Sequence, residues 1–433
     1  MKKRRRSDPS APLRGEVEVP GDKSISHRAF LLAALARGTS RFGHLNTGLD
    51  VRATAGLVGA LGARTSFTEG ETEAEVEGYG SQEFREPESV IDAGNSGTTV
   101  RCGLGLCAGV DGLSVLTGDA TLQRRPMLRV VAPLRQMGAS IDGRHYGDRL
   151  PLAVRGGELV GLDFESNVAS AQVKTAVLLA GLSAAGATSV TEPAPSRDHT
   201  ERLLRSAGVD VQQEGLRVTV QGGIAPEPLS LTVPGDFSSA AFLVAGALLL
   251  PGSDLTITAV GLNPTRAGLL RVLDRMGANV ERESDDGGDR EPVGDLRIRS
   301  SSLRAAEVGP DEVPSLIDEL PVFAVLATQA EGISVVRGAE ELRVKESDRI
   351  ETMATALRAL GADIEPTTDG FVVTGPTPLN GGEVDSAADH RVALSLAVAG
   401  LVAKDNVRIK GWSSTETSFP EFLPLLAAAR SRS

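Results

Sequence analysis

The chain has 433 residues, of which 41% are hydrophobic and 24% are charged, and its formal net charge is −12. This length fits about two domains of ordinary size, and the composition is typical of a globular protein rather than a membrane-embedded or disordered one. The negative charge argues against a general nucleic-acid binder, and an aromatic content of 3% leaves few side chains on which bases could stack.

The chain begins with the basic run Met1–Arg6, which lacks the apolar core of a signal peptide. We expect residues 1–12 to form a disordered basic tail. Contact with nucleic acid or with a membrane is the alternative interpretation of this run. The longest apolar stretch, Ala240–Leu250, is about half as long as a membrane-spanning helix needs to be. The sequence therefore predicts no membrane partner.

The two cysteines, Cys102 and Cys107, lie in one apolar stretch with no Cys-x-x-Cys or Cys/His cluster nearby. This pattern argues against a disulfide framework and against structural zinc, and it favours a reducing, cytoplasmic compartment. No other metal-ligand spacing and no Ser-His-Asp arrangement is evident in the sequence. We therefore expect neither a metal ion nor another cofactor.

The tetrapeptide Val-Pro-Gly-Asp occurs twice, at Val19–Asp22 and Val233–Asp236. Each copy precedes a run rich in Ala and Leu, a pattern typical of a strand, a turn and a helix N-terminus. The first copy continues into Lys23–Arg28, which is charged, and the second continues into the uncharged Phe237–Ala241. Because a helix N-terminus already attracts anions, we predict an anion site at the first copy and a purely architectural role for the second.

A segment with a Gly, Ser, Asn or Asp head followed by an apolar helix recurs six times, at steps of about 70 residues. The predicted apolar helices cover Ala29–Ala36, Arg101–Gly109, Val173–Gly181, Ala240–Leu250, Val322–Ala330 and Val392–Val402. Between them lie second helices that end in Gly-Ala or Gly-Val, where glycine fits a C-terminal cap, and then strands. One step is longer and contains the acidic stretch Glu283–Asp289, which we interpret as a surface-loop insertion.

The two Val-Pro-Gly-Asp copies stand three repeat steps apart, which predicts an α/β fold of two similar domains with three units each. We expect residues 22–234 to form the first domain, and residues 13–21 plus 235–433 to form the second. The final helix, Glu421–Ala429, has no strand after it, so we expect the strand Arg14–Val19 to complete the sixth unit. We expect the active site in the cleft between the two domains.

Unusual side chains at particular helix heads indicate which units carry chemistry. Cationic, hydroxyl and amide side chains gather at Lys23, Ser24, Arg28, Asn95–Arg101, Gln123–Arg125, Ser170, Gln172, Ser196–His199, Arg343–Arg349 and Asp389–Arg391. With Asp318 and Glu346, this set suits a substrate that carries several negative charges and undergoes proton transfer. Each feature also has a simpler explanation: Asp318 or Asp389 can cap a helix, and Arg343–Arg349 can be a solvated face.

Six motifs stand in order along the chain: Gly21–Arg28, Gly94–Arg101, Ser170–Lys174, Arg343–Arg349, Asp389–Arg391 and Thr417–Pro420. Together they resemble the 5-enolpyruvylshikimate-3-phosphate synthase (3-phosphoshikimate 1-carboxyvinyltransferase) family. The resemblance implies two domains of three repeated units, each an inside-out α/β barrel. It also implies transfer of the enolpyruvyl group of phosphoenolpyruvate to the 5-hydroxyl of 3-phosphoshikimate, in the shikimate pathway to chorismate and the aromatic amino acids. Glyphosate is the inhibitor expected at such a site.

The resemblance also implies a role for individual residues. It places 3-phosphoshikimate on Lys23, Ser24, Arg28, Ser170, Ala171, Gln172, Arg197, Asp318 and Lys345. It places phosphoenolpyruvate on Lys23, Gly97, Arg125, Gln172, Arg349 and Arg391. Asp318 would accept the proton of the attacking hydroxyl, Glu346 would handle the proton on the methylene carbon, and Lys23 would contact both substrates. We expect a monomer with these two small molecules as its partners.

Ala171, Arg197 and Thr417 depart from the better-known branch of the family and look like its second bacterial class. This departure leaves the C-terminal phosphoenolpyruvate contact near Thr417 open. The nearest alternative is the sister transferase that acts on UDP-N-acetylglucosamine, but this chain lacks the loop cysteine of that enzyme. A non-enzymatic repeat ring, such as a DNA sliding clamp, is an alternative from a different functional class.

Overall fold

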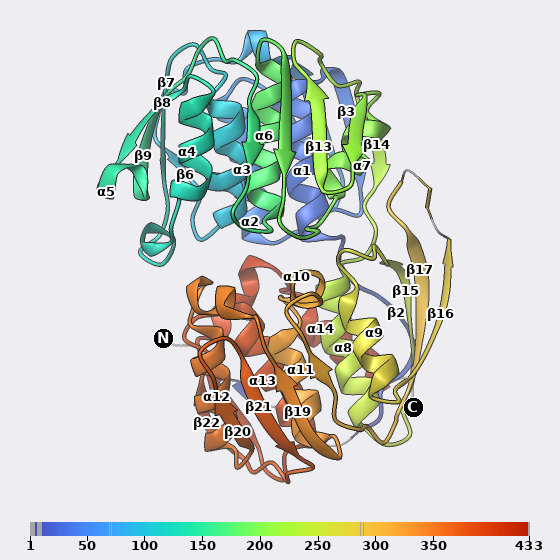
Figure 1. The fold of residues 1–433 in the computed structure, drawn as a ribbon. Coiled ribbons are helices and arrows are strands. Elements are labelled where there is room, and N and C mark those ends of the chain that lie inside the picture. Colours follow the sequence, from blue (N-terminus) through green and yellow to red (C-terminus); the bar gives the residue numbers. More distant parts are fainter. Residues whose placement is uncertain are drawn as a thin grey trace. The chain divides into compact units, whose positions relative to one another are not determined.

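A computed structural model describes residues 5–6, 11–68, 70, 72–285, 287–288 and 290–431 of the chain (Figure 1). These residues form two compact units. Unit 1 contains the described residues up to Pro20, between Pro234 and Gly287, and from Pro292 onwards, whereas unit 2 contains those from Gly21 to Val233 and from Gly288 to Glu291. The chain therefore changes unit inside both Val-Pro-Gly-Asp segments. The assignment of residues 288–291 to unit 2 was not predicted.

Unit 2 contains three sheets of four strands that share one arrangement. In each sheet the first two strands are parallel and the remaining neighbours are antiparallel. The strand orders are β14 (Ser230–Thr232), β3 (Arg37–Gly43), β5 (Ala74–Tyr79), β4 (Arg64–Phe67); β6 (Ile91–Asp92), β7 (Leu113–Thr117), β9 (Arg149–Arg155), β8 (Ser140–Gly143); and β10 (Asp163–Glu165), β11 (Ala187–Thr191), β13 (Arg217–Gln221), β12 (Val211–Glu214).

Unit 1 repeats this arrangement in two sheets and shortens it in a third. The orders are β2 (Arg14–Glu18), β15 (Asp254–Gly261), β17 (Val293–Arg299), β16 (Asn279–Asp285); β18 (Glu307–Val308), β19 (Gly332–Val336), β21 (Phe371–Gly375), β20 (Asp363–Pro366); and β22 (Gly382–Asp385), β23 (Val407–Lys410), β1 (Arg5–Arg6). In the third sheet β1 pairs antiparallel with β23, at the position that a hairpin strand fills in the other sheets. The expectation of a disordered tail over residues 1–12 is therefore wrong for Arg5 and Arg6, which pair with β23, while residues 1–4 and 7–10 lie outside the described residues.

The six predicted apolar helices all form, and each packs on one sheet (Figure 1). They are α1 (Lys23–Leu35), α3 (Gly97–Cys107) and α6 (Ala171–Ser183) in unit 2, and α8 (Phe237–Leu249), α11 (Leu320–Gln329) and α13 (His390–Val402) in unit 1. Almost every residue of these helices is buried, as expected for helices that are apolar all round. Cys102 and Cys107 are buried, free thiols of α3.

Further helices link the strands of each unit. They are α2 (Leu49–Ala60), η1 (Ser81–Glu83), η2 (Leu122–Arg124), α4 (Leu128–Gln136), α5 (Arg144–Gly147) and α7 (His199–Ser206) in unit 2, and α9 (Gly268–Arg275), α10 (Val313–Leu316), η3 (Glu340–Val344), α12 (Arg349–Ala359), η4 (Trp412–Thr417) and α14 (Phe422–Ser431) in unit 1. Within the part of the chain that the structure describes, no helix has the length and apolar character needed to cross a membrane.

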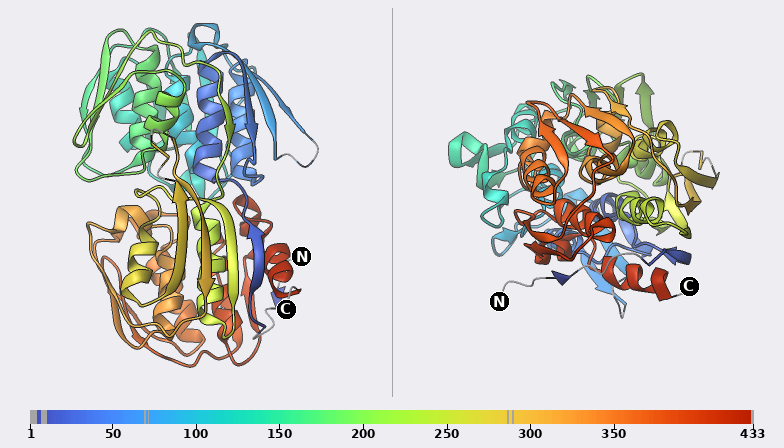
Figure 2. Two further views of the ribbon diagram at one scale, coloured as in Figure 1. Left: turned by 90° about the vertical axis from the view of Figure 1, so that its right-hand side faces the viewer. Right: turned by 90° about the horizontal axis from the view of Figure 1, so that it is seen from below.

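The expectation that Arg14–Val19 completes the sixth unit is wrong. Strand β2 pairs in parallel with β15, the strand that follows α8. It therefore belongs to the sheet of the fourth of the six sequence repeats. Strand β14 shows the reciprocal arrangement, because it pairs in parallel with β3, the strand that follows α1. Helix α14 lies beside β2, and no hairpin strand follows it in the described residues (Figure 2). The strand before each Val-Pro-Gly-Asp segment thus belongs to the unit that the chain is leaving.

The insertion at Glu283–Asp289 is only partly the surface loop that we expected. Glu283, Ser284 and Asp285 extend strand β16 and pair with Asp295, Gly294 and Val293 of β17. Residues 286 and 289 lie outside the described part. The acidic, glycine-rich composition therefore marks the end of a hairpin rather than a separate loop.

Candidate active site

Five of the six apolar helices begin with a side chain that caps the first turn. Asp22, Ser96, Ser170, Asp236 and Asp389 each accept a hydrogen bond from a backbone N–H group two or three residues further on. Such caps stabilise a helix start and leave other N–H groups of the first turn available to an anion. Of the predicted site residues, Lys23, Ser24, Gly97, Ala171, Gln172 and Arg391 lie in the first turns after these caps.

Lys23, the first residue of α1, forms an ion pair with Asp50 of α2, with Nζ and Oδ2 3.0 Å apart. One turn further along α1, His27 shares a hydrogen bond of 2.6 Å with the Thr54 hydroxyl, which is 2.6 Å from the Thr99 hydroxyl. Burial lowers the pKa of His27 well below its ordinary value, and the charge of Lys23 acts in the same direction. His27 is therefore neutral at pH 7. Asp50 was not among the predicted site residues.

Arg28 is buried in unit 2 and is held by neutral oxygens. Its Nε donates to the Thr200 hydroxyl at 2.8 Å, its Nη2 to the Thr175 hydroxyl at 3.0 Å, and its Nη1 to the Ser24 carbonyl at 3.0 Å. Among the described residues no carboxylate forms an ion pair with it, so its charge is available to an anionic ligand. Arg197 donates to the Ser24 hydroxyl at 3.5 Å. Three predicted residues for 3-phosphoshikimate thus lie together.

Gly97, the first residue of α3, lies against two guanidinium groups. A Cβ atom at this position would be 3.0 Å from Nη1 of Arg125 and 3.2 Å from Nη1 of Arg101. Arg101 also donates to the Gln172 side-chain oxygen at 2.9 Å, and Gln172 donates to the Thr98 hydroxyl at 2.9 Å. The side chain of Gln172 therefore links the start of α6 to Thr98 and Arg101 of α3. Arg101 was noticed in the sequence but was not predicted to bind a substrate.

Ser170 and Ala171 begin helix α6, and both are half-buried. The backbone N–H of Ser170 donates to Glu192 at 2.9 Å. Glu192 also forms an ion pair with Lys174, whose ammonium group contacts Glu201 as well. The structure therefore gathers all nine predicted residues of unit 2 around the starts of α1, α3 and α6: Lys23, Ser24, Arg28, Gly97, Arg125, Ser170, Ala171, Gln172 and Arg197.

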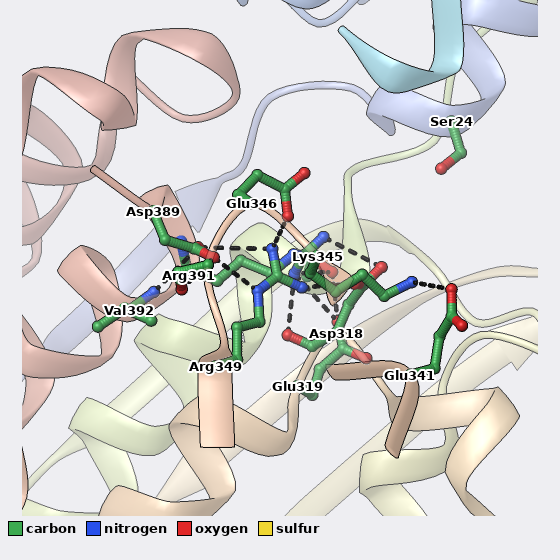
Figure 3. A network of polar contacts seen from close by, with 12 residues as sticks. Ser24, Asp318, Glu319, Glu341, Lys345, Glu346, Arg349, Asp389, Arg391 and Val392 are labelled. Carbon is green, nitrogen blue, oxygen red and sulfur yellow. Dashed lines mark hydrogen bonds and ion pairs between the residues drawn. The ribbon is translucent and has the colours of Figure 1, made fainter. Parts of the chain in front are cut away.

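The five predicted residues of unit 1 lie around one buried guanidinium group (Figure 3). Arg349, the first residue of α12, is 1% exposed. Its Nε donates to Asp389 at 2.9 Å, its Nη1 to Asp318 at 3.2 Å and its Nη2 to Glu346 at 2.6 Å. Burial alone would lower the pKa of Arg349, but Asp389, Glu346 and Asp318 together raise it. A fixed positive charge is the consequence.

Arg391 contacts the other oxygen of Asp318. Its Nη2 lies 3.3 Å from Oδ2 of Asp318, and its Nη1 donates to the Asp318 carbonyl at 3.1 Å and to the Ser238 hydroxyl at 2.8 Å. Burial lowers the pKa of Arg391, while Asp318 and Glu319 oppose that shift. Behind this pair, Ser238 also contacts Glu319 and Arg266. Asp318 is therefore a carboxylate held between two arginines.

Lys345 lies next to this cluster, with its ammonium group 3.7 Å from Glu341 (Figure 3). Burial lowers the pKa of Lys345, and Arg349 acts in the same direction, whereas Glu341, Asp318 and Glu346 raise it. The lysine therefore loses its proton more readily than a solvated lysine does. Among the described residues, no group of three or more His, Cys, Asp or Glu side chains could hold a metal ion.

The structure distinguishes between several alternatives that the sequence left open. Asp389 caps α13, as the simpler interpretation predicts, and it also forms an ion pair with Arg349. Asp318 caps no helix, because α11 begins after Glu319 without a side-chain cap. Arg349 is buried and is not part of a solvated face. Ser238, which follows the second Val-Pro-Gly-Asp copy, bridges Arg391, Arg266 and Glu319 inside the fold.

Comparison with known proteins covers nearly the whole chain. Residues 7–426 match the family model described as EPSP synthase (3-phosphoshikimate 1-carboxyvinyltransferase). The 3-phosphoshikimate 1-carboxyvinyltransferase of Gloeobacter violaceus is 52% identical, with 98% of each chain covered. The protein of the same name from Bacillus licheniformis is 47% identical, with 95% of this chain and 96% of the relative covered.

Solved structures show the same likeness. EPSP synthase from Acinetobacter baumannii superposes with a TM-score of 0.87 at 40% identity, with 98% of each chain covered. The enolpyruvyl transferase NikO from Streptomyces tendae superposes with a TM-score of 0.77 at 18% identity, covering 98% of this chain and 96% of the other, and this likeness concerns the fold alone. These structures confirm the predicted fold class.

Proposed function

The chain belongs to the EPSP synthase family, and we propose that the two groups of residues described above perform the reaction of that family on this protein. In this reaction the enolpyruvyl group of phosphoenolpyruvate moves to the 5-hydroxyl of 3-phosphoshikimate, and phosphate leaves. Full-length relatives at about half identity support this substrate pair. The alternatives, a transferase for UDP-N-acetylglucosamine or a repeat ring without catalysis, are not favoured.

The observation that carries the proposal is the environment of Asp318, a carboxylate fixed by a guanidinium group on each side. Arg349 contacts Oδ1 and Arg391 contacts Oδ2, at 3.2 Å and 3.3 Å. A positioned carboxylate can accept a proton from a hydroxyl group, and the two arginines can bind the carboxylate and phosphate of phosphoenolpyruvate. An acid–base group and anion-binding groups are therefore present within one constellation.

We assign 3-phosphoshikimate to the hydroxyl and cationic residues of unit 2. The phosphate suits Arg197, Ser170 and the first turn of α6, where hydroxyl, guanidinium and backbone donors are near one another. Ser24 and Arg28 suit the ring hydroxyls and carboxylate, because Arg28 is charged and held only by neutral oxygens. Lys345 and Asp318 complete the set at the reacting 5-hydroxyl, with Ala171 and Gln172 beside the ring.

We assign phosphoenolpyruvate to Lys23, Gly97, Arg125, Gln172, Arg349 and Arg391. Two of its groups are anionic, and four of these six residues are cations. Gly97 permits the close approach of Arg125 to the start of α3, where a guanidinium group and a helix N-terminus can bind a phosphate together. Cations that surround the leaving phosphate also stabilise the charge that develops as the C–O bond breaks.

The proposed reaction has an addition step and an elimination step. In the addition, the 5-oxygen bonds to C2 of phosphoenolpyruvate, Asp318 takes the hydroxyl proton, and a proton reaches the methylene carbon C3. In the elimination, C3 loses a proton, the C2–oxygen bond to phosphate breaks, and phosphate leaves. Glu346 is the proposed carrier of the C3 proton, because a hydrogen bond of 2.6 Å from Arg349 holds its carboxylate in place. Lys23, at the start of α1, contacts both substrates.

Substitution of the two acids tests these roles. Asp318→Asn and Glu346→Gln are each expected to lower turnover by about 100-fold or more, the usual range for general acid–base groups. Asp254→Asn is the matched control, because Asp254 of β15 pairs with Arg297 of β17 and both side chains are nearly half exposed. In D₂O the Glu346→Gln variant should also slow deuterium entry into the product methylene. Unchanged turnover in either variant would remove that residue from the mechanism.

We also propose that the protein works as a monomer in the cytoplasm. All proposed site residues come from one chain, and the buried thiols Cys102 and Cys107 suit a reducing compartment. Light scattering at assay concentration tests the oligomeric state. A dimer mass that persists on dilution would contradict the monomer.

A further inference from the structure

Lys174 joins two glutamates inside unit 2. Its ammonium group lies 2.8 Å from Oε2 of Glu192 and 2.7 Å from Oε1 of Glu201. The three side chains are only 4%, 4% and 1% exposed, and they come from α6, from the segment after β11 and from α7. Burial alone would lower the pKa of Lys174, but Glu201 and Glu192 raise it, so the lysine stays charged.

A buried ion triad is a costly way to stabilise a fold. Removing charges from water is expensive, and well-packed apolar side chains of similar volume often give equal or greater stability. None of the three residues is assigned a contact with a substrate. The triad therefore calls for an explanation beyond packing, and the remaining contacts of Glu192 supply one.

Glu192 fixes two chain segments that carry proposed substrate-binding residues. Its Oε1 accepts the backbone N–H of Ser170 at 2.9 Å, and its Oε2 accepts the hydroxyl of Ser196 at 2.8 Å. The Ser170 hydroxyl accepts from the Val173 N–H at only 3.5 Å, so the bond to Glu192 is the shorter of the two at this helix start. Ser196 directly precedes Arg197. One carboxylate thus sets the positions of Ser170 and Arg197 together.

The other two members of the triad lie next to the partners of Arg28. Lys174 precedes Thr175, and Glu201 follows Thr200. These two threonine hydroxyls are 2.6 Å apart, and both accept hydrogen bonds from the guanidinium group of Arg28. The ion triad is therefore adjacent in sequence to Thr175 and Thr200, which bind Arg28, and it contacts Ser170 and Ser196 through Glu192.

We propose that Glu192, which pairs with Lys174 inside this buried triad, is a positioning residue for the binding of 3-phosphoshikimate. It touches no substrate and acts through Ser170 and Arg197, so it affects this substrate and leaves phosphoenolpyruvate and the chemical step largely unaffected. The inference rests on the proposed function.

Glu192→Gln is the central test. If the amide oxygen accepts from Ser170, the amide NH₂ must face the Lys174 ammonium group, and two donors then oppose each other. The variant leaves Lys174 and Glu201 as a balanced ion pair, so we expect it to fold. Its KM for 3-phosphoshikimate, and the Kd from calorimetric titration with that compound alone, should rise about tenfold or more. Its KM for phosphoenolpyruvate and its kcat should change less than about threefold.

Three further variants make the test sharper. Ser196→Ala removes only the link to the Arg197 segment and should raise the KM for 3-phosphoshikimate about threefold. Lys174→Arg keeps the charge and should keep most of the affinity, whereas Lys174→Met should not. Lys410→Met is the control, because it removes a half-exposed lysine that pairs with Glu383 in unit 1, whereas the triad lies in unit 2.

The possible outcomes separate the two proposals. If the wild-type protein binds 3-phosphoshikimate and Glu192→Gln binds it equally well, the positioning role is wrong and the proposed function stands. Equal losses in both KM values and in kcat, together with a lower melting temperature, would show a merely structural role. If the wild-type protein neither binds 3-phosphoshikimate nor turns over, both proposals are overturned.

Discussion

Replacing Arg349 by methionine tests how strongly the buried acids of unit 1 depend on one guanidinium group. The substitution keeps an unbranched stem and removes a charge that contacts Asp389, Glu346 and Asp318. Removing one partner of a buried ion pair costs about 3–5 kcal/mol, because the remaining charge stays buried. At about 2–4 °C per kcal/mol for a domain of this size, the melting temperature should fall by roughly 6–20 °C.

Differential scanning calorimetry at pH 7 measures this loss in the transition that unfolds unit 1. Arg337→Met is the control, since Arg337 is 61% exposed and its partner Glu307 is 71% exposed. An exposed pair of this kind is worth about 1 kcal/mol at most, so the control should shift by no more than a few degrees. A melting temperature of Arg349→Met within about 2 °C of the wild-type value would contradict this prediction.

Three further predictions concern Gly97, Lys345 and His27. In Gly97→Ala the new methyl group would approach Nη1 of Arg125 to 3.0 Å. Steady-state kinetics should therefore show about a tenfold higher KM for phosphoenolpyruvate and a higher Ki for glyphosate. Unchanged constants would show that phosphoenolpyruvate and glyphosate do not bind beside Gly97. Because burial lowers the pKa of Lys345 below its usual 10.5, turnover should fall as the pH rises through the lowered pKa. Lys345→Arg should move that fall to higher pH. Identical pH–rate profiles of the two proteins would contradict the role of the ammonium group. Because burial lowers the pKa of His27 below its usual 6.5, at acidic pH the unfolded chain binds a proton that the folded chain does not. As the pH decreases from 6.5, the free energy of unfolding should therefore decrease by at most about 1.4 kcal/mol per pH unit. Urea denaturation of His27→Gln between pH 7 and pH 5 should lack this part of the slope, and an unchanged slope would assign the effect to other groups.

The sequence predicts most of the fold because the signals of the six apolar helices are local. Apolar runs, capping residues such as Asp22 and Asp389, and glycines after helices all act within a few residues of one another. Strand partners depend on distant segments instead. Arg14 pairs with Asp254, and no local pattern in either strand encodes that register. This long-range pairing explains why Arg14–Val19 was assigned to the wrong sheet.

The candidate site divides in the same way. The sequence motifs identified the candidate binding residues, and the structure places those of each unit close together. The side chains that contact and orient these residues were mostly not predicted. Asp50 and Arg266 look like ordinary surface charges in the sequence, and only folding reveals that they lie against Lys23 and Ser238. Glu319 was noticed beside Asp318, but its contact with Arg391 was not predicted. Lys174 did carry a signal, because it is a lone charge within an otherwise apolar helix, which predicts a buried ionic partner.

Phosphate release measured with both substrates present, and with each omitted in turn, tests the proposed reaction most directly. We expect release only when phosphoenolpyruvate and 3-phosphoshikimate are both present, with one enolpyruvyl product formed for each phosphate. Asp318→Asn should lower both signals together by about 100-fold or more. Release that needs no 3-phosphoshikimate, or that occurs only with UDP-N-acetylglucosamine, would contradict the assignment.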